Sequence, residues 1–437
     1  MIRWRLSGGL GTLIGPPGVG KTKAGAGESV LAHEENGEKV LLVAYTNSAA
    51  NEFCREICEF LGPERAKEVA IRTGQLEGYQ PTPQCPIEFT LDPSKIRQKP
   101  IVVTTTLSAT RKYLPRDIMF DRVIEDETGI ERLEHMLIPL VYCIDSAVRR
   151  RILRERDPFS LAERPSGAQN LLGLLEDYDV TATFIGDPKQ SKPISPVSYD
   201  YSAIAYTASR TRTETLKTTY RLPYNLDNIV DQFADYGGLR AHSSIVNRRL
   251  RVIKRPERAF MELLDPDQVV SYVNVEGQEQ KQGISSCSNP AEAKAVVNLA
   301  TQLYRCTEGQ VSIMAIAKYK AQRRLISEYA KHAGISLDSR TTTGALGAQA
   351  DVTIFSQTRC NSDLEIGGVA VLQDLNVAIS RARSKLLIVG SWNMLERGWV
   401  ALPTPQTRGW RGVAWKLARL LEKHGVAPVE APDQLIR

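Results

Sequence analysis

A glycine-rich segment near the start of the chain has the residue types of a phosphate-binding loop. Residues 15–22 read GPPGVGKT, which fits the pattern GxxxxGK followed by Ser or Thr. The segment follows an apolar run at Leu10–Ile14 and opens a stretch that we predict to be helical to about Ala32. Backbone N–H groups can wrap phosphates at such a helix N-terminus, Lys21 would reach the β and γ phosphates, and the Thr22 hydroxyl would bind Mg²⁺. A chance glycine-rich turn is the alternative. The predicted nucleotide-binding residues here are Gly15, Pro16, Pro17, Gly18, Val19, Gly20, Lys21, Thr22 and Lys23.

A second segment ends an apolar run in adjacent carboxylates. Arg122–Ile124 leads into Glu125, Asp126 and Glu127. Asp126 would hold Mg²⁺, usually through water, and Glu127 would polarise an attacking water. In a strand, Glu125 and Glu127 would both face away from Asp126 unless the strand has ended, so the preference for Glu127 as the base rests on motif resemblance. Two solvated loop acids are the alternative.

A third segment, FIGDPKQ at 184–190, takes an apolar run into a Gly-Asp-Pro turn. Gln190 would lie at the carboxyl end of this predicted strand. Its amide would hydrogen-bond the γ-phosphate or the attacking water, and a plain turn is the alternative.

Short apolar, β-branched runs alternate with helical stretches along the chain. Such alternation is typical of parallel sheets covered by helices on both faces. The predicted strands are Leu10–Ile14, Lys39–Ala44, Ile101–Thr104, Arg122–Ile124, Thr181–Ile185, Val311–Ile316, Val352–Phe355 and Lys385–Val389. They fall into two groups, so we predict an α/β chain with domains at residues 1–200 and 201–437. The Pro-rich residues 74–100, predicted to be loop, and the partly Arg-rich residues 131–177 are interpreted as insertions in the first domain.

Composition excludes several classes of protein. A chain of 437 residues with 42% hydrophobic and 24% charged residues is not disordered throughout. The longest nearly apolar run, Met136–Ile144, has nine residues, whereas a membrane-spanning helix needs about 20. Glycines interrupt the first apolar residues, which argues against a secretory signal. Seven cysteines without CxxC spacing predict free thiols in a reducing intracellular compartment, with neither disulfides nor zinc.

The net charge of +6 permits a polyanionic partner but does not require one. Arginines gather at 149–156 and again, with one lysine, at 248–258. Each run is either a solvated face or a set of phosphate contacts, and the sequence leaves both interpretations open.

Further segments follow in an order that is typical of one family. They are AYTNSAAN at 44–51, VTTT at 103–106, DETG at 126–129, GDPKQ at 186–190, TYRLP at 219–223, AKY with Gln322 at 317–322, and LNVAISRAR at 375–383. With the phosphate-binding loop, this order and spelling resemble superfamily I helicases, in the branch of the nonsense-mediated-decay helicase and its relatives. By this resemblance, motif I is residues 15–22, motif Ia 44–51, motif Ic 103–106, motif II 126–129, motif III 186–190, motif IV 219–223 and motif VI 375–383. The resemblance covers nearly the whole chain, and motifs I and VI are its most specific parts.

The resemblance implies two tandem RecA-like domains with an ATP cleft between them. Arg221 and Arg381, supplied by the second domain, would stabilise charge on the γ-phosphate, with Arg381 favoured over Arg383 as the arginine finger. Tyr220 would stack on adenine, a core tyrosine being the alternative. Gly347 and Arg383 would also contact the nucleotide, although a salt bridge on a helix surface is the alternative for Arg383. The nucleic-acid contacts implied are Thr46, Asn47 and Ser48 in motif Ia, Thr104 and Thr105 in motif Ic, and Thr343 near motif V.

Two departures qualify the resemblance. The family reads QGxExD in motif V, whereas this chain has LGAQAD at 346–351, with Leu346 and Gln349 replacing Gln and Glu. Because those positions link the ATP state to the grip on nucleic acid, coupling and processive unwinding are in doubt. Only 14 residues precede the phosphate-binding loop. We therefore expect no upstream adenine-reading glutamine or β-barrel, and the chain is either a compact or a trimmed form.

Together these features predict an ATP- and Mg²⁺-dependent helicase or translocase on single-stranded RNA or DNA, moving 5′ to 3′. A nucleic-acid-stimulated ATPase that remodels ribonucleoprotein without processive unwinding is the alternative, and a nucleic-acid clamp with little turnover is a third. We expect a monomer, away from membranes, with protein partners from replication or RNA processing.

Overall fold

The computed structural model describes residues 9–75, 78–115, 117–155, 180–190, 202–283, 286–400 and 413–436. The chain forms two compact units. Unit 1 comprises residues 1–15, 20–188 and 192–216, and unit 2 comprises residues 16–19, 189–191 and 217–437. The seven cysteines all lie in the described residues, and none of them forms a disulfide. No helix in the described stretches is long and apolar enough to cross a membrane.

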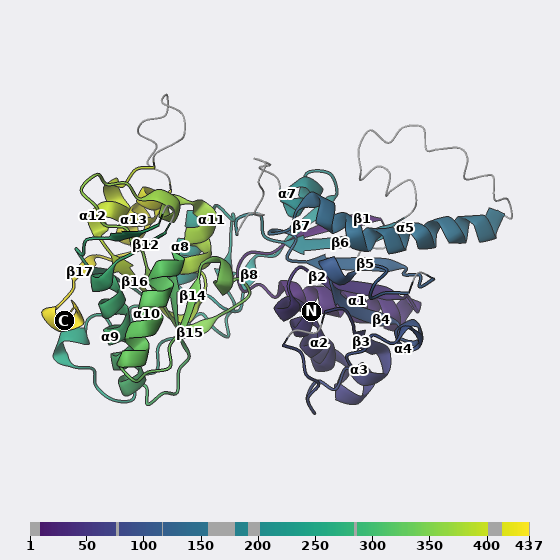
Figure 1. Ribbon diagram of the computed structural model, residues 1–437, viewed down its shortest axis with the longest axis horizontal. Coiled ribbons are helices and arrows are strands. Elements are labelled where there is room, and N and C mark those ends of the chain that lie inside the picture. The colour runs from purple at the N-terminus through teal and green to yellow at the C-terminus, as the bar shows by residue number, and fades with distance from the viewer. Residues whose placement is uncertain are drawn as a thin grey trace, which may run out of the picture. The chain divides into compact units, whose positions relative to one another are not determined.

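Unit 1 is built on a seven-stranded parallel sheet with the order β3-β4-β2-β5-β6-β1-β7 (Figure 1). Its strands are β1 (Leu10–Ile14), β2 (Val40–Ala44), β3 (Ala70–Arg72), β4 (Ile101–Thr105), β5 (Arg122–Asp126), β6 (Thr181–Gly186) and β7 (Arg212–Thr215). The apolar runs predicted as strands are all present, and β2 is buried along its whole length, as a parallel strand covered on both faces must be. The sequence did not predict β3, which is short, or β7, whose residues RTET lack an apolar run.

Helices cover both faces of this sheet. They are α1 (Lys21–Asn36), α2 (Asn47–Leu61), α3 (Pro63–Val69), α4 (Pro93–Gln98), α5 (Leu133–Glu155) and α7 (Ala203–Ala208), with the short 3₁₀ helix η1 (Thr106–Ser108). Apolar residues of α1 and α2 pack in one core, and those of α5 and α7 pack in a second core on the opposite face (Figure 1). Helix α1 runs past the predicted end at Ala32 because Gly37, with φ of 67°, caps it in the left-handed conformation.

The two predicted insertions differ in structure. Residues 78–100 are mostly loop, as predicted, but Pro93 starts α4, where Asp92 caps the helix by accepting a hydrogen bond from Ser94 N. The second insertion begins with α5. Its residues 156–179, and the side chains of the arginines at 149–151 and 154, lie outside the described residues.

Unit 2 contains a six-stranded parallel sheet with the order β14-β13-β15-β16-β10-β17. Its strands are β10 (Val270–Asn274), β13 (Ile313–Ala317), β14 (Asp338–Thr341), β15 (Ala350–Ser356), β16 (Ala382–Gly390) and β17 (Pro428–Glu430). Two small pairs accompany it, β8 (Thr218–Thr219) with β9 (Arg240–Ala241), and β11 (Gln280–Gln282) with β12 (Ser286–Ser288). The α/β class and the parallel sheets are therefore as predicted.

The helices of unit 2 are α8 (Leu226–Ala234), α9 (Pro290–Cys306), α10 (Lys320–His332), α11 (Leu372–Ile379), α12 (Trp392–Arg397), α13 (Ala414–Lys423) and α14 (Asp433–Ile436), with the 3₁₀ helices η3 (Arg258–Phe260), η4 (Thr343–Ala345) and η5 (Gly367–Ala370). Helices α9 and α10 share one apolar core with the central strands. The last and longest segment of unit 2 begins at residue 217, directly after β7, which pairs with β1 in the unit 1 sheet.

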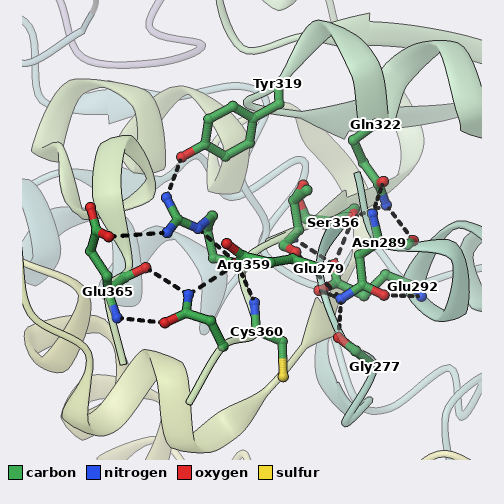
Figure 2. A network of polar contacts seen from close by, with 12 residues as sticks. Gly277, Glu279, Asn289, Glu292, Tyr319, Gln322, Ser356, Arg359, Cys360 and Glu365 are labelled. Carbon is green, nitrogen blue, oxygen red and sulfur yellow. Dashed lines mark hydrogen bonds and ion pairs between the residues drawn. The ribbon is translucent and has the colours of Figure 1, made fainter. Parts of the chain in front are cut away.

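A buried carboxyl group ties together the segments around α9, α10 and β15 (Figure 2). Glu292 is completely buried, and its carboxyl oxygens accept hydrogen bonds from Ser356 Oγ at 2.7 Å, Thr358 N at 2.7 Å and Asn289 Nδ2 at 3.1 Å. Gln322 of the AKY segment is also buried and bonds Asn289 N and Ser356 Oγ. Burial raises the pKa of Glu292 to about 8, although its hydrogen bonds oppose the shift.

Beside Glu292, Arg359 Nε donates to Glu279 Oε2 at 2.8 Å, and Arg359 Nη1 donates to Tyr319 Oη at 3.4 Å (Figure 2). Tyr319 and Gln322 of the AKY segment therefore both belong to this internal network.

We predict that Glu292→Gln changes how the stability of the protein depends on pH. The folded carboxyl group holds its proton to about pH 8, whereas the unfolded group releases it near 4.5. The wild-type free energy of unfolding should therefore fall as pH rises between these values, by at most about 1.4 kcal/mol per pH unit. Urea unfolding at several pH values should show the variant gaining stability relative to wild type as pH rises, and a constant difference would contradict the prediction. As a control, Glu292→Ala removes the same titrating carboxyl group, so it should show the same change with pH relative to wild type, on top of a cost of about 2–4 kcal/mol from the buried donors that it leaves unpaired.

Candidate nucleotide and nucleic-acid site

One edge of the unit 1 sheet gathers most of the predicted motifs. Strands β4, β2, β5, β6 and β1 are consecutive neighbours and run parallel, so their carboxyl ends meet at the same edge. Motifs Ic, Ia, II, III and I follow these strands in that spatial order. Ligands of open parallel sheets bind outside this edge, because the loops that follow the strands converge there.

The phosphate-binding loop and motif II meet directly. Thr22 Oγ1 donates a hydrogen bond of 2.7 Å to Asp126 Oδ2, and Lys21 Nζ donates one of 2.6 Å to Gly15 O. Gly20 caps α1 with φ of 81°, a left-handed conformation that favours glycine. Burial raises the pKa of Asp126, while the charge of Lys21 and the bond from Thr22 oppose the shift.

These groups suit a magnesium nucleotide. A hydroxyl and a carboxylate oxygen side by side are ligands that Mg²⁺ accepts, and Mg²⁺ commonly completes its shell with phosphates and water. Across the described residues, no group of three or more His, Cys, Asp or Glu side chains could hold a metal ion.

Two parts of the predicted nucleotide site are placed differently from expectation. Residues 16–19 group with unit 2, where Thr219 Oγ1 donates to Pro17 O at 2.9 Å and Tyr220 N donates to Gly18 O at 2.8 Å. Lys23 pairs with Glu59 at 2.8 Å and Glu56 at 3.3 Å, both on α2. Residues two apart on a helix point in different directions, so the Lys23 side chain faces α2 while Lys21 bonds Gly15 O.

The two glutamates that flank Asp126 lie in different environments. Glu127 has φ of 64°, so the strand has ended there and alternation no longer applies. Glu125 is completely buried in β5 and accepts a hydrogen bond of 3.2 Å from Thr106 Oγ1. Glu127 Oε2 instead accepts two hydrogen bonds from Thr46, from N at 3.1 Å and from Oγ1 at 2.8 Å. Glu127 thus lies at the edge that carries the phosphate-binding loop, while Glu125 faces the core.

The electrostatics of Glu127 suit a group that exchanges a proton near neutral pH. Burial, reinforced by the negative charge of Asp126, raises its pKa to about 7. The two hydrogen bonds from Thr46 and the charge of Lys21 oppose this shift. A general base works best with a pKa near the operating pH.

A hollow of about 920 Å³ lies over motifs Ia and Ic in unit 1. Four predicted nucleic-acid residues line it, Thr46, Asn47, Ser48 and Thr105. The side chain of the fifth predicted residue in this unit, Thr104, is completely buried in β4. Thr343 belongs to unit 2, where it is exposed in η4.

Sequence reasoning missed other residues of this hollow. Arg55, Lys112 and Tyr113 line it, with Lys112 Nζ 5.0 Å from the centre of the Tyr113 ring. Buried Arg72 supports the hollow from below by donating from Nη2 to Asn47 Oδ1 at 2.9 Å. In the sequence, the adjacent Lys112 and Tyr113 shortly after motif Ic could have indicated a nucleic-acid contact, but they match no known motif.

In unit 2, motifs IV, V and VI hold the predicted arginines. Arg221 Nε donates to Gln349 Oε1 at 3.1 Å, and Arg221 Nη1 donates to Ser380 O at 3.2 Å. Arg381 is almost completely buried, and its Nη2 donates to Gln190 Oε1 at 3.3 Å. Two predicted phosphate-facing residues, Gln190 and Arg381, are therefore adjacent.

The remaining predicted residues of unit 2 are at its surface. Arg383 lies in strand β16 rather than on a helix, and its Nε is 3.7 Å from Asp351 Oδ1. Tyr220 is 52% exposed and stacks on His242 with ring centres 4.6 Å apart, so it is not a core tyrosine. Gly347 is exposed and has φ of 72°.

Comparison with known proteins finds relatives among helicases. The AAA domain family matches residues 200–393. An uncharacterized ATP-dependent helicase of Methanocaldococcus jannaschii is 27% identical over 187 residues, which are 42% of this chain and 27% of that protein. The DNA replication ATP-dependent helicase/nuclease DNA2 of Mus musculus is 23% identical over 437 residues, covering 91% of this chain and 37% of that protein.

A third relative represents the branch that the motifs resemble. The regulator of nonsense transcripts 1 homolog of Drosophila melanogaster is 27% identical over 192 residues, 42% of this chain and 16% of that protein. The chain thus spans between 16% and 37% of the length of these three relatives. With the motif order, these matches relate the chain to superfamily I helicases of the kind represented by DNA2 and the regulator of nonsense transcripts 1, as its sequence predicts.

Proposed function

We propose that the chain is an ATP-dependent helicase or translocase on single-stranded RNA or DNA. Its resemblance to superfamily I helicases implies that it moves in the 5′ to 3′ direction. The observation that carries the proposal is the carboxyl edge of the unit 1 sheet. There, Lys21, Thr22, Asp126 and Glu127 lie next to a polar hollow lined by motifs Ia and Ic. The three relatives described above, two helicases and a regulator of nonsense transcripts homolog, support the same activity.

Each residue of the nucleotide site has a chemical task in this proposal. The Lys21 ammonium group and the N-terminus of α1 bind the β and γ phosphates through positive charge and N–H donors. Thr22 Oγ1 and Asp126 hold Mg²⁺, which when bound supplies positive charge against the phosphates. Glu127 Oε2 accepts the proton of the attacking water. Arg221 and Arg381 stabilise the negative charge on the γ-phosphate, and Gln190 hydrogen-bonds the γ-phosphate or the attacking water.

The hollow of unit 1 is the proposed seat of the nucleic acid. Its hydroxyl and amide side chains, with Arg55 and Lys112, offer donors and positive charge to a phosphate backbone. The Tyr113 ring offers a surface on which a base can stack. Backbone contacts of this kind serve RNA and DNA alike.

A second candidate function is favoured by the residues of motif V. Neutral Gln349, where the family has Glu, accepts a hydrogen bond from Arg221 instead of forming an ion pair with it. The alternative is therefore a nucleic-acid-stimulated ATPase that remodels ribonucleoprotein without processive unwinding. Strand displacement measured for wild type and for Leu346→Gln with Gln349→Glu distinguishes the two, since the remodeller gains displacement only with the family residues.

The proposed activity predicts that single-stranded nucleic acid stimulates ATP hydrolysis. Hydrolysis should be measured with and without single-stranded RNA and DNA, and Lys21→Ala should abolish it because the phosphates lose their principal cation. Comparison of the two polymers identifies the preferred substrate. Hydrolysis that neither polymer changes, together with no binding of either, would refute the helicase proposal.

We predict that Glu127→Gln binds ATP as wild type does but hydrolyses it about 10²-fold to 10⁴-fold more slowly, the usual contribution of a general base. Equilibrium binding of a fluorescent ATP analogue and single-turnover hydrolysis measure the two effects separately. Glu125→Gln is the matched control, because Glu125 faces the core. If Glu125→Gln lost turnover and Glu127→Gln kept it, the base would be misassigned.

Arg381→Ala should slow hydrolysis about 10³-fold or more if Arg381 acts as an arginine finger. Arg419→Ala, which removes an exposed arginine of α13 paired with Glu396 and Glu422, is the matched control and should retain wild-type turnover. Stopped-flow phosphate release measures both rates. A loss of only about tenfold for Arg381→Ala would make Arg381 a structural residue.

A further inference from the structure

Thr46 lies between the nucleotide residues of the unit 1 edge and the hollow over motifs Ia and Ic. It follows β2, precedes α2 and caps that helix, accepting a hydrogen bond of 3.2 Å from Ala49 N at its Oγ1. Its own two donors, N and Oγ1, both point to a single acceptor, Glu127 Oε2. The candidate base is therefore held by a residue of motif Ia rather than by another residue of the nucleotide site.

The same threonine lines the hollow proposed for nucleic acid. Its donors lie at the N-terminus of α2, a helix of 15 residues, where the helix dipole and free N–H groups favour an anion. In the structure the anion there is the Glu127 carboxylate. A backbone phosphate that enters the hollow needs donors of the same kind.

We infer that the Glu127 carboxylate and a backbone phosphate of the nucleic acid compete for the two donors of Thr46, so that a bound strand releases the base. This inference rests on the proposed function and adds the contact through which the strand acts on hydrolysis. While Thr46 is bonded to Glu127, one carboxylate oxygen is engaged and the base is held away from a water. When the phosphate takes the donors, Glu127 Oε2 is free to accept the water proton.

Competition has a consequence that does not depend on catalysis. If strand binding must displace the carboxylate, weakening the bond between Thr46 and residue 127 must strengthen strand binding, since the two effects are thermodynamically reciprocal. Glu127→Gln weakens the hydrogen bonds from Thr46, because a neutral amide oxygen is a weaker acceptor than a carboxylate.

The test is a double-mutant cycle on strand affinity, measured without nucleotide by the fluorescence anisotropy of labelled oligothymidine and oligouridine. Glu127→Gln should tighten binding about fivefold or more, the lower end of typical coupling between sites. In a Thr46→Val background, which lacks the hydroxyl donor but keeps N–H, less than half of this gain should remain. Ser48→Ala is the matched control, because Ser48 lines the same hollow and the full gain should persist there.

Equal gains in all three backgrounds would overturn the inference, since removal of a negative charge alone would then explain them. Failure of wild type to bind either oligonucleotide would instead overturn the proposed function and this inference with it. The two failures are thus distinguishable.

Hydrolysis supplies a second readout. Thr46→Val should raise the basal rate and lower the ratio of stimulated to basal hydrolysis, whereas Thr46→Ser, which keeps the hydroxyl, should retain a higher ratio than Thr46→Val. A basal rate lowered by Thr46→Val would overturn the inference, because Thr46 would then hold Glu127 in its active position.

Discussion

The parallel register of β2 and β5 is the constraint on which the unit 1 site depends. Ala44, the last residue of β2, pairs with Asp126, the last residue of β5. The chain therefore leaves both strands at the same level, and the residues that follow, Thr46 and Glu127, come within hydrogen-bond distance. A slip of register would move the motif Ia threonine away from the acid and would also turn Asp126 from Thr22.

The rest of the edge extends from this pair in both directions. Strand β4 lies beyond β2 and contributes motif Ic to the hollow, whereas β6 and β1 lie beyond β5 and contribute motif III and the phosphate-binding loop. Close approach of backbones holds the second group together, since a Cβ at Gly129 would lie 2.6 Å from Asp187 O. The contacts proposed for nucleic acid and for phosphate therefore follow the order of the strands along one sheet.

Unit 2 also has a parallel sheet, but the predicted site residues beside its strands are arginines instead of carboxylates. Motif V lies before β15 and motif VI leads into β16, its neighbour in the sheet, which places Gln349 and Asp351 near Arg221 and Arg383 respectively. The amide of Gln349 satisfies a donor of Arg221 without cancelling its charge. The departure of motif V from the family pattern therefore has a local structural effect in this chain.

The sequence by itself determined the eight strands that it predicted from apolar runs, the parallel α/β class and the phosphate-binding loop, because apolar runs and a Gly-Lys-Thr signature are local patterns. It did not determine short or polar strands such as β3 and β7, whose pairing depends on neighbours distant in the chain. Only the tertiary structure decided that Glu125 faces the core and Glu127 the edge, since that depends on the residue at which β5 ends. It also decided that Lys23 pairs with acids of α2, that Thr104 is buried, and that Thr46 bonds Glu127 across 81 residues of sequence. Strand order and register alone bring residues so distant in the sequence together.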